Sequence, residues 1–257
     1  MLRAGLALDG ELLALASSSH SGEPEHLSGV RRILAGAGLA ETDLGNTPAP
    51  PTDDDAAFAW RATGHAPASI TQNCSGKHAA MLATCAAAGW PIDGYLDPAH
   101  PLQRVIRAEV SAQTGDGEPA YVGVDGCGAP LFSCSLVGLA RAFARIATAA
   151  PGTPEARVAA AIRANPWWLG GTARMVTRLI ETVPGLIAKD GAEGVFVAAL
   201  PDGRALAVKI VDGSMRPIPA VVVEALRALG VDADGLADLG LVEVLGHGEP
   251  VGLVEVG

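Results

Sequence analysis

The 257-residue sequence has few cysteines, few basic residues and no long apolar run. Four cysteines are too few to staple a chain of this length, which excludes the disulfide-rich class and indicates a reducing compartment. Lys and Arg number 18 against 28 Asp and Glu, and the net charge of -10 argues against nucleic acid or an anionic membrane as a partner. No segment reaches membrane-spanning length without a charge or a breaker, so we expect a soluble, cytoplasmic protein.

Hydrophobic residues make up 49% of the sequence, which is enough for a full core, and no internal repeat or interdomain linker divides the chain. We therefore expect a single domain over residues 1–257. Periodicity and breakers predict helices over residues 27–37, 56–62, 76–88, 101–114, 133–148, 154–163, 172–182 and 218–229. Strands are predicted over residues 11–18, 121–124, 195–200 and 205–211, and on either side of a turn at 246–250. Residues 1–9 resemble the end of a helix, because no capping residue precedes their leucines.

The stretch Asn73-Cys74-Ser75-Gly76-Lys77-His78 gathers a thiol, a hydroxyl, an amine and an imidazole where a helix is predicted to begin. Ser75 is expected to cap that helix and Gly89 to end it. The partial positive charge of a helix start favours Cys74 as a thiolate and Lys77 as a neutral amine. This combination suits a soft metal ion or an activated nucleophile, but a buried cysteine beside a solvated lysine would give the same residues.

A second stretch, a short predicted strand followed by a turn of glycines, presents Cys127. Two thiolates and one amine, from Cys74, Cys127 and Lys77, would form a soft ligand set for zinc with water as the fourth ligand. Asp125 or His78 could support such a site by hydrogen bonding to a ligand or a water. Nothing in the spacing forces the two stretches together, so a tight turn with an incidental buried cysteine stays open as the alternative.

Lys189 lies on the way into a predicted strand hairpin whose turn is Pro201-Asp202-Gly203-Arg204. The tripeptide Lys189-Asp190-Gly191 resembles the Lys-Thr-Gly element that active-site serine enzymes place at a strand edge. Those enzymes also carry a Ser-x-x-Lys pair, in which a neutral lysine takes the proton of the serine. This sequence contains no Ser-x-x-Lys. An exposed strand-end lysine remains the alternative for Lys189.

Four blocks that lie far apart in the sequence carry these residues. They read Ser-His-Ser-Gly-Glu-Pro from Ser19, Asn-Cys-Ser-Gly-Lys-His from Asn73, Val-Asp-Gly-Cys-Gly-Ala-Pro from Val124 and Lys-x-Gly-Ala-Glu-Gly-Val from Lys189. Together they resemble the rhizobial-type L-asparaginase family (asparaginase II), from about Ala14 to the C-terminus. The resemblance implies an α/β (α+β) fold similar to that of the serine β-lactamases and glutaminases, with an antiparallel sheet flanked by helices. It also implies a homodimer that hydrolyses L-asparagine to L-aspartate and ammonia.

The resemblance further implies a role for each residue that matches a family motif. Zinc is implied as an auxiliary cofactor, with ligands at Cys74, Lys77 and Cys127 and with support from Asp125. Ser19 matches the second of two active-site serines, and its expected partner is Lys189, with Lys209 as the weaker choice. The substrate-binding residues that follow from the resemblance are His20, Arg174 and His78. A fixed guanidinium such as that of Arg174 could hold a substrate carboxylate through two hydrogen bonds.

One departure from the family pattern concerns its Arg-Ser-x-x-Lys-Pro block, which supplies the first serine and its lysine. In the family this block lies N-terminal to the place that Met1 occupies here. We therefore expect an N-terminally truncated chain with weak or no activity, or a paralogue that has lost the pair. Two other functions stay open: a degenerate domain that binds zinc and an amino acid, and a hydrolase in which zinc-bound water does the chemistry.

Overall fold

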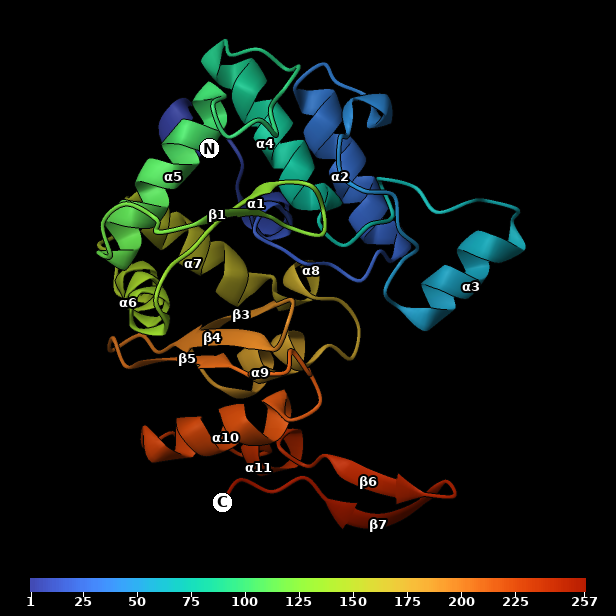
Figure 1. The fold of residues 1–257 in the computed structure, drawn as a ribbon, viewed down its shortest axis with the longest axis vertical. Helices are drawn as coiled ribbons and strands as arrows, with labels where there is room; N and C mark the ends of the chain where they lie inside the picture. Colours follow the sequence, from blue (N-terminus) through green and yellow to red (C-terminus); the bar gives the residue numbers. More distant parts are fainter.

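The computed structural model describes residues 1–257 as a mixed, helix-rich chain with small antiparallel sheets (Figure 1). The α-helices are α1 (Gly10–Ala16), α2 (Pro24–Gly36), α3 (Asp54–Ala62), α4 (Ser75–Ala88), α5 (Pro101–Thr114), α6 (Leu136–Ala147), α7 (Pro154–Ala164), α8 (Pro166–Leu169), α9 (Met175–Thr182), α10 (Ile218–Ala228) and α11 (Leu236–Leu239). Two short 3-10 helices are η1 (Leu2–Ala4) and η2 (Glu41–Asp43). None of the helices combines the length and the apolar character that crossing a membrane requires.

The largest sheet has three antiparallel strands in the order β3 (Ile187–Gly191), β4 (Val195–Ala199) and β5 (Ala205–Lys209). Its central strand β4 is apolar throughout and almost wholly buried, because helices cover the sheet. Helix α6 packs on β4 and β5, α9 packs on β3, and α10 packs on β4 and β5. The predicted hairpin between the last two strands is confirmed, as is the prediction of antiparallel strands flanked by helices.

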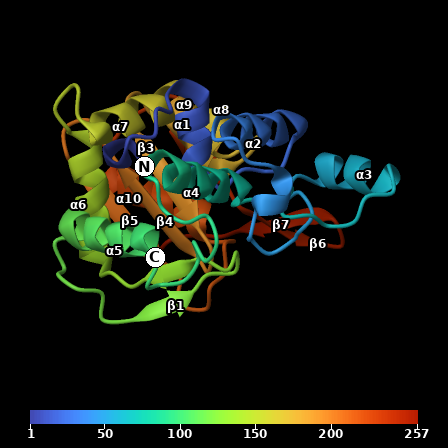
Figure 2. The same ribbon diagram turned by 90° about the horizontal axis from the view of Figure 1, so that it is seen from above.

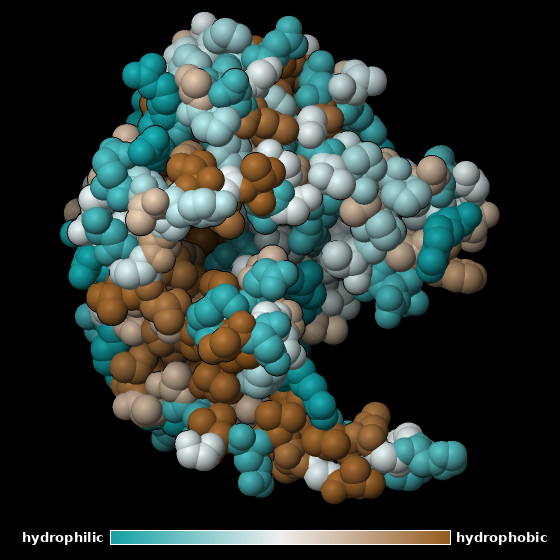
Figure 3. All heavy atoms as spheres, in the orientation of Figure 1, coloured by the Kyte–Doolittle hydropathy of each residue, from teal (hydrophilic) through white to brown (hydrophobic).

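Two smaller antiparallel pairs lie outside this sheet. The first pairs β1 (Val122–Val124) with β2 (Pro130–Phe132), and the turn between them carries Cys127. The second pairs β6 (Glu243–Gly246) with β7 (Glu249–Leu253). This C-terminal hairpin projects from the body of the molecule, and every residue of β7 is exposed (Figure 1, Figure 3). Helix α3 also projects from the body, as two perpendicular views show (Figure 1, Figure 2).

The buried apolar residues form two clusters. The N-terminal cluster has 23 buried residues and joins α1, α2 and α4 through side chains such as Leu13, Val30 and Leu82. The C-terminal cluster has 22 buried residues and joins the three-stranded sheet to α9 and α10 through side chains such as Leu179 and Phe196. The two clusters adjoin at α7, which contributes Ala161 to the first and Ala159 and Ile162 to the second.

Gly76 determines how closely α4 can approach α1. A Cβ atom at this position would lie 2.5 Å from the backbone oxygen of Leu15, which is closer than a carbon and an oxygen can approach. Because backbone cannot move aside as a flexible side chain can, only glycine allows this contact. The close packing fixes the first turn of α4, which carries Cys74 at the N-cap position and Lys77 one turn further on.

Most predicted helices are confirmed to within a few residues, including α5 at both ends and α4 with Gly89 in the left-handed conformation after it. The prediction of a strand over residues 11–18 is wrong, because residues 10–16 form α1. Leu13, Ala14, Leu15 and Ala16 are all buried, and a short apolar run that is buried on every side has no periodicity by which to tell a helix from a strand.

Three smaller predictions are also wrong. Residues 1–9 are not the end of a helix but contain only the 3-10 turn η1. Residues 164–171, which lie between two predicted helices and were assigned neither helix nor strand, contain the four-residue helix α8, since proline is compatible with the first turn of a helix. Ser75 does not cap α4: Cys74 occupies the N-cap position, and the Ser75 hydroxyl donates instead to the backbone oxygen of Ile70 at 2.7 Å.

Candidate functional site

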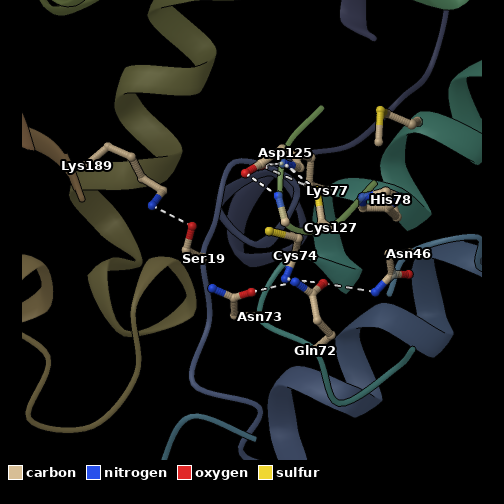
Figure 4. A network of polar contacts seen from close by, with 12 residues as sticks. Ser19, Asn46, Gln72, Asn73, Cys74, Lys77, His78, Asp125, Cys127 and Lys189 are labelled. Atoms are coloured by element: carbon tan, nitrogen blue, oxygen red, sulfur yellow. Dashed lines mark hydrogen bonds and ion pairs between the residues drawn. The ribbon is translucent and has the colours of Figure 1, made fainter. Parts of the chain in front are cut away.

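A serine and a lysine, 170 residues apart in sequence, are in hydrogen-bond contact. Ser19 lies in the loop after α1, and Lys189 lies on β3. The Lys189 Nζ atom donates to the Ser19 Oγ atom at 2.7 Å (Figure 4). Lys209, the weaker sequence-based choice, is exposed and its amine donates to the backbone of Ile210. The structure therefore brings Lys189, and not Lys209, to Ser19.

Burial lowers the pKa of Lys189 from its ordinary value of 10.5, and the nearby positive charge of Arg174 lowers it further. The carboxylate of Asp190 acts in the opposite direction, with its Oδ1 atom 2.8 Å from the lysine nitrogen. A lysine with a lowered pKa is neutral more often at a given pH and can then accept a proton. The pair thus has the geometry for proton transfer from the serine hydroxyl.

Asp190 holds two cations at once. It pairs with Lys189 and with the guanidinium of Arg174, and its side chain is only 12% exposed. Burial by itself would raise the pKa of Asp190, but the two positive charges outweigh it and lower the pKa. The predicted substrate contact of Arg174 stays a prediction, since one of its nitrogens is already used by Asp190. The sequence did not indicate a site role for Asp190, although this residue directly follows the predicted site residue Lys189.

A second group of side chains gathers the two cysteines of the predicted metal site. The thiols of Cys74 and Cys127 and a carboxylate oxygen of Asp125 all lie within 4.8 Å of one another. The Lys77 Nζ atom lies 3.5 Å from the Cys127 Sγ atom and 3.5 Å from the Asp125 Oδ2 atom. The structure thus brings together all four residues that the sequence assigned to this site (Figure 4).

The two thiols are unequal. A hydrogen bond with Cys127 lowers the pKa of Cys74 to about 6, and the charge of Lys77 contributes to this shift. The same hydrogen bond, together with burial, raises the pKa of Cys127 to about 12. The two shifts favour Cys74 over Cys127 as the thiolate, in the direction that the sequence predicted, and the leading cause is the neighbouring Cys127.

The prediction of a neutral Lys77 is wrong for these side chains alone. Burial would lower the pKa of Lys77, but the charges of the Cys74 thiolate and the Asp125 carboxylate, together with the interactions of Lys77 with Cys127, outweigh burial and raise the pKa. Lys77 is therefore the counter-ion of the thiolate. To bind a metal it would have to give up a proton, as metal ligands generally do.

The donor set fits a metal ion. Thiolate sulfurs favour zinc and other soft cations, and the carboxylate of Asp125 or the amine of Lys77 could complete a set of three protein ligands. A buried nitrogen without a partner lies on the same turn of α4: His78 is fully buried, and its Nε2 atom has no hydrogen-bond partner. The other ring nitrogen of His78 is 2.8 Å from the hydroxyl of Tyr95. Two segments converge here, the start of α4 and the turn between β1 and β2.

His20 is fully buried beside Ser19 and uses both ring nitrogens within the protein. Its Nδ1 atom accepts from the backbone N–H of Gly22 at 3.1 Å, so its Nε2 atom carries the proton and donates to the Ser75 hydroxyl at 2.9 Å. These contacts fix the Ser19 loop against α4. The predicted contact of His20 with substrate stays a prediction, and the hydrogen bonds instead give it a supporting position.

The sequence also did not indicate a row of three hydrogen-bonded side-chain amides. Asn46, Gln72 and Asn73 are linked by side-chain hydrogen bonds, and Asn73 lies between Ser19 and Cys74 in Figure 4. Only Asn73 carried a sequence signal, as the first residue of the block that contains Cys74. A cavity of about 440 Å³ lies elsewhere, between η1, α5 and α7, and none of the site residues lines it.

The side chains of Cys74, Lys77, Asp125 and Cys127 are called the thiol group below. The serine–lysine contact and the thiol group make the chain a candidate hydrolase with a possible metal-binding site. A sequence model of the family described as L-asparaginase II matches residues 1–256. The chain therefore belongs to the L-asparaginase II family, whose name denotes an amidohydrolase acting on asparagine. No curated protein matches the sequence.

Proposed function

We propose that the protein is an L-asparagine amidohydrolase that works by serine–lysine acyl transfer. The observation that supports this most strongly is the 2.7 Å contact between Lys189 Nζ and Ser19 Oγ, made by a lysine whose pKa is lowered by burial. Family membership supplies the substrate, since the family name specifies asparagine. The proposal includes a fold related to the serine β-lactamases, in which Lys189 on a sheet edge takes the place of the Lys-Thr-Gly lysine.

The reaction begins when the hydroxyl oxygen of Ser19 attacks the side-chain amide carbon of L-asparagine. The neutral amine of Lys189 accepts the proton of the Ser19 hydroxyl and can return it to the leaving nitrogen, so that ammonia departs. Water then hydrolyses the acyl-enzyme to release L-aspartate. Asp190 and Arg174 hold Lys189 in place, and the buried His20 holds the serine loop.

The thiol group would hold a zinc ion through Cys74, Lys77 and Cys127, with Asp125 as support or as a ligand in place of Lys77. When bound, zinc would position a substrate oxygen or a water molecule and so raise the affinity for substrate. Cys127 and Lys77 lower the pKa of Cys74 and so favour its thiolate, which is the form that binds a metal. Zinc is proposed as an auxiliary group, and the serine remains the reacting residue.

Ammonia release from L-asparagine tests the proposal. It is measured on this chain and on one extended upstream of Met1, each with zinc and with a chelator. Activity only in a chain that carries the family's Ser-x-x-Lys pair, which this sequence lacks, would support a serine route that needs this pair in addition to Ser19 and Lys189. Equal activity in both chains that a chelator abolishes would support zinc-water hydrolysis instead. Absence of activity in both, with zinc retained, would support a binding domain.

The assembly state is a separate part of the proposal. Family resemblance favours a homodimer, and several apolar side chains of the C-terminal hairpin are exposed, among them Leu245 and Val251. Sedimentation equilibrium on this chain measures its mass in solution directly. A mass of twice the 25.9 kDa chain is expected, and a single-chain mass at all concentrations would contradict the dimer.

A further inference from the structure

Asn73 lies where the two parts of the site meet. Its backbone oxygen accepts from the backbone N–H of His20 at 3.0 Å, which places it one residue from Ser19. The next residue in the chain is Cys74, one of the two clustered thiols. Asn73 is half-buried, so its side chain is partly open to solvent. Its side chain lies between Ser19 and Cys74 (Figure 4).

Two backbone groups fix the orientation of the side-chain amides of Asn46 and Gln72, because a carbonyl oxygen can only accept a hydrogen bond and an N–H group can only donate one. The Asn46 side chain lies 2.8 Å from the backbone oxygen of Ser69, which can only accept, so the Asn46 group there is the N–H₂ group. That same Nδ2 atom lies 2.9 Å from Gln72. The backbone N–H of Cys74, which can only donate, lies 3.0 Å from the same Gln72 atom. Two donors thus identify this atom as the oxygen Oε1 of Gln72.

The orientation of Asn73 then follows. With its oxygen facing Asn46 and Cys74, Gln72 has its Nε2 atom on the other side, where it donates to the Asn73 Oδ1 atom at 2.8 Å. The Asn73 Nδ2 atom is therefore the outward end of the amide, directed away from Gln72 (Figure 4). No protein acceptor binds this group, and it is not among the buried side-chain atoms without a partner. It is an oriented, solvent-accessible donor pair.

We infer that Asn73 is a substrate-binding residue that offers its N–H₂ group to an oxygen of L-asparagine, and that Gln72 is a positioning residue that keeps the amide in this orientation. The inference rests on the proposed function for the identity of the substrate. L-asparagine carries a carboxylate and an amide carbonyl, and both are acceptors. The N–H₂ group of Asn73 is held in place by hydrogen bonds that lead back to fixed backbone groups, so it need not reorganise when substrate binds. Such preorganisation favours the affinity and selectivity for a substrate oxygen next to this group.

The test is a calorimetric titration of L-asparagine into the zinc-loaded protein, which measures binding whether or not turnover is weak. Asn73→Asp replaces the outward donor by an acceptor of the same shape, and we expect binding to weaken by about tenfold or more. Gln72→Glu keeps both bonds that Gln72 Oε1 accepts but removes the donor to Asn73. The side-chain amide of Asn73 should then flip so that its N–H₂ group faces the new carboxylate at position 72 instead of the substrate, and the affinity for L-asparagine should fall by about three- to tenfold. Val211→Asp, at a position that is 96% exposed, adds the same charge away from the site and should leave binding unchanged.

Metal analysis and circular dichroism accompany each titration. Both variants should retain zinc and the wild-type spectrum, which separates loss of a substrate contact from damage to the thiol group or the fold. If Asn73→Asp fails to fold, Gln72→Glu decides. If the wild-type protein binds L-asparagine and the folded variants bind it with the same affinity, the inference is overturned and the proposed function stands. Absence of binding to the wild type would overturn the proposed function and this inference with it.

Discussion

At the scale of single residues, lysine is the most informative side chain of this protein. The chain has only three lysines, and two of them lie in the site, one beside Ser19 and one beside the thiols. Their electrostatic states are opposite. Burial lowers the pKa of Lys189, whereas two thiols and a carboxylate raise the pKa of Lys77. Only Lys189 is thus prepared to act as a base, and Lys77 serves as a counter-charge.

The state of Lys189 predicts how activity depends on pH. Its amine must be neutral to accept the proton of Ser19, and the neutral fraction grows as pH rises through its pKa in the folded protein. Because that pKa is lowered from 10.5, the rise in kcat should be centred below pH 10.5. The measurement is the pH profile of ammonia release in a chain that turns over. A rate that falls with pH over the alkaline range would contradict this role.

The thiol group predicts the effect of removing one cysteine. Cys127→Ala takes away a sulfur and the hydrogen bond that lowers the pKa of Cys74, so zinc affinity should fall by at least about tenfold. Cys134→Ala, which changes an exposed cysteine outside the group, is the matched control and should retain its zinc. Zinc per chain, measured after dialysis against a weak chelator, reports the result. Equal zinc in both variants would remove Cys127 from the ligand set.

The sequence predicted which residues meet in the site better than it predicted their states. The proximity of Cys74 to Cys127 and of Ser19 to Lys189 came from the resemblance, which carries information about three-dimensional contacts. The charge of Lys77 could not be predicted, because it depends on Asp125 and Cys127, whose approach to α4 is a matter of tertiary packing. The same holds for the Ser75 hydroxyl, which bonds Ile70 and His20 instead of capping its own helix.

At the scale of elements, the contact of α4 with α1 decides where the site residues lie. Helix α1 was predicted as a strand because its buried run shows no periodicity, whereas α4 was predicted well from its glycine at the end and its alanine-rich interior. The two helices pack so closely that the site depends on the absence of a side chain at Gly76. That requirement is invisible in the sequence, where Gly76 would simply count as a weak helix former.

A pair of glycine substitutions tests this packing. Gly76→Ala places a methyl group against the Leu15 backbone and should lower the free energy of unfolding by about 1–3 kcal/mol. Gly36→Ala, at the end of α2, meets no atom within 4 Å and should raise it by about 0.5–1 kcal/mol. Urea unfolding followed by circular dichroism measures both. Equal stability of the two variants would show that α4 can shift away from α1 at little cost.

At the scale of the whole molecule, the site lies between two apolar clusters. Ser19 and Cys74 come from segments attached to the N-terminal cluster, and Lys189 comes from the sheet of the C-terminal cluster. Contacts such as that of Lys189 with Ser19 therefore depend on how the two clusters dock. This docking was beyond the reach of periodicity, which reports single elements, and the antiparallel sheet flanked by helices was predictable only as a class.

The C-terminal hairpin contributes no residue to either cluster, which predicts that it can be removed. A chain ending at Gly240 should fold, with Tm lowered by less than ~4 °C and zinc binding retained. A chain ending at Leu229 also loses Leu236 and Leu239, which are buried in the C-terminal cluster, and should be far less stable. Thermal unfolding of both chains provides the comparison. A large loss of stability on removing the hairpin alone would show that it supports the core.

The most direct test of the whole account is ammonia release from L-asparagine by chains with and without the serine–lysine contact. In a chain that turns over, Ser19→Ala and Lys189→Met should each lower kcat by about 100-fold or more while zinc content and fold are retained. A double variant should be hardly worse than either single one, because the two residues act as a unit. Turnover that persists at the wild-type rate in either single variant would contradict the claim that this pair performs the chemistry.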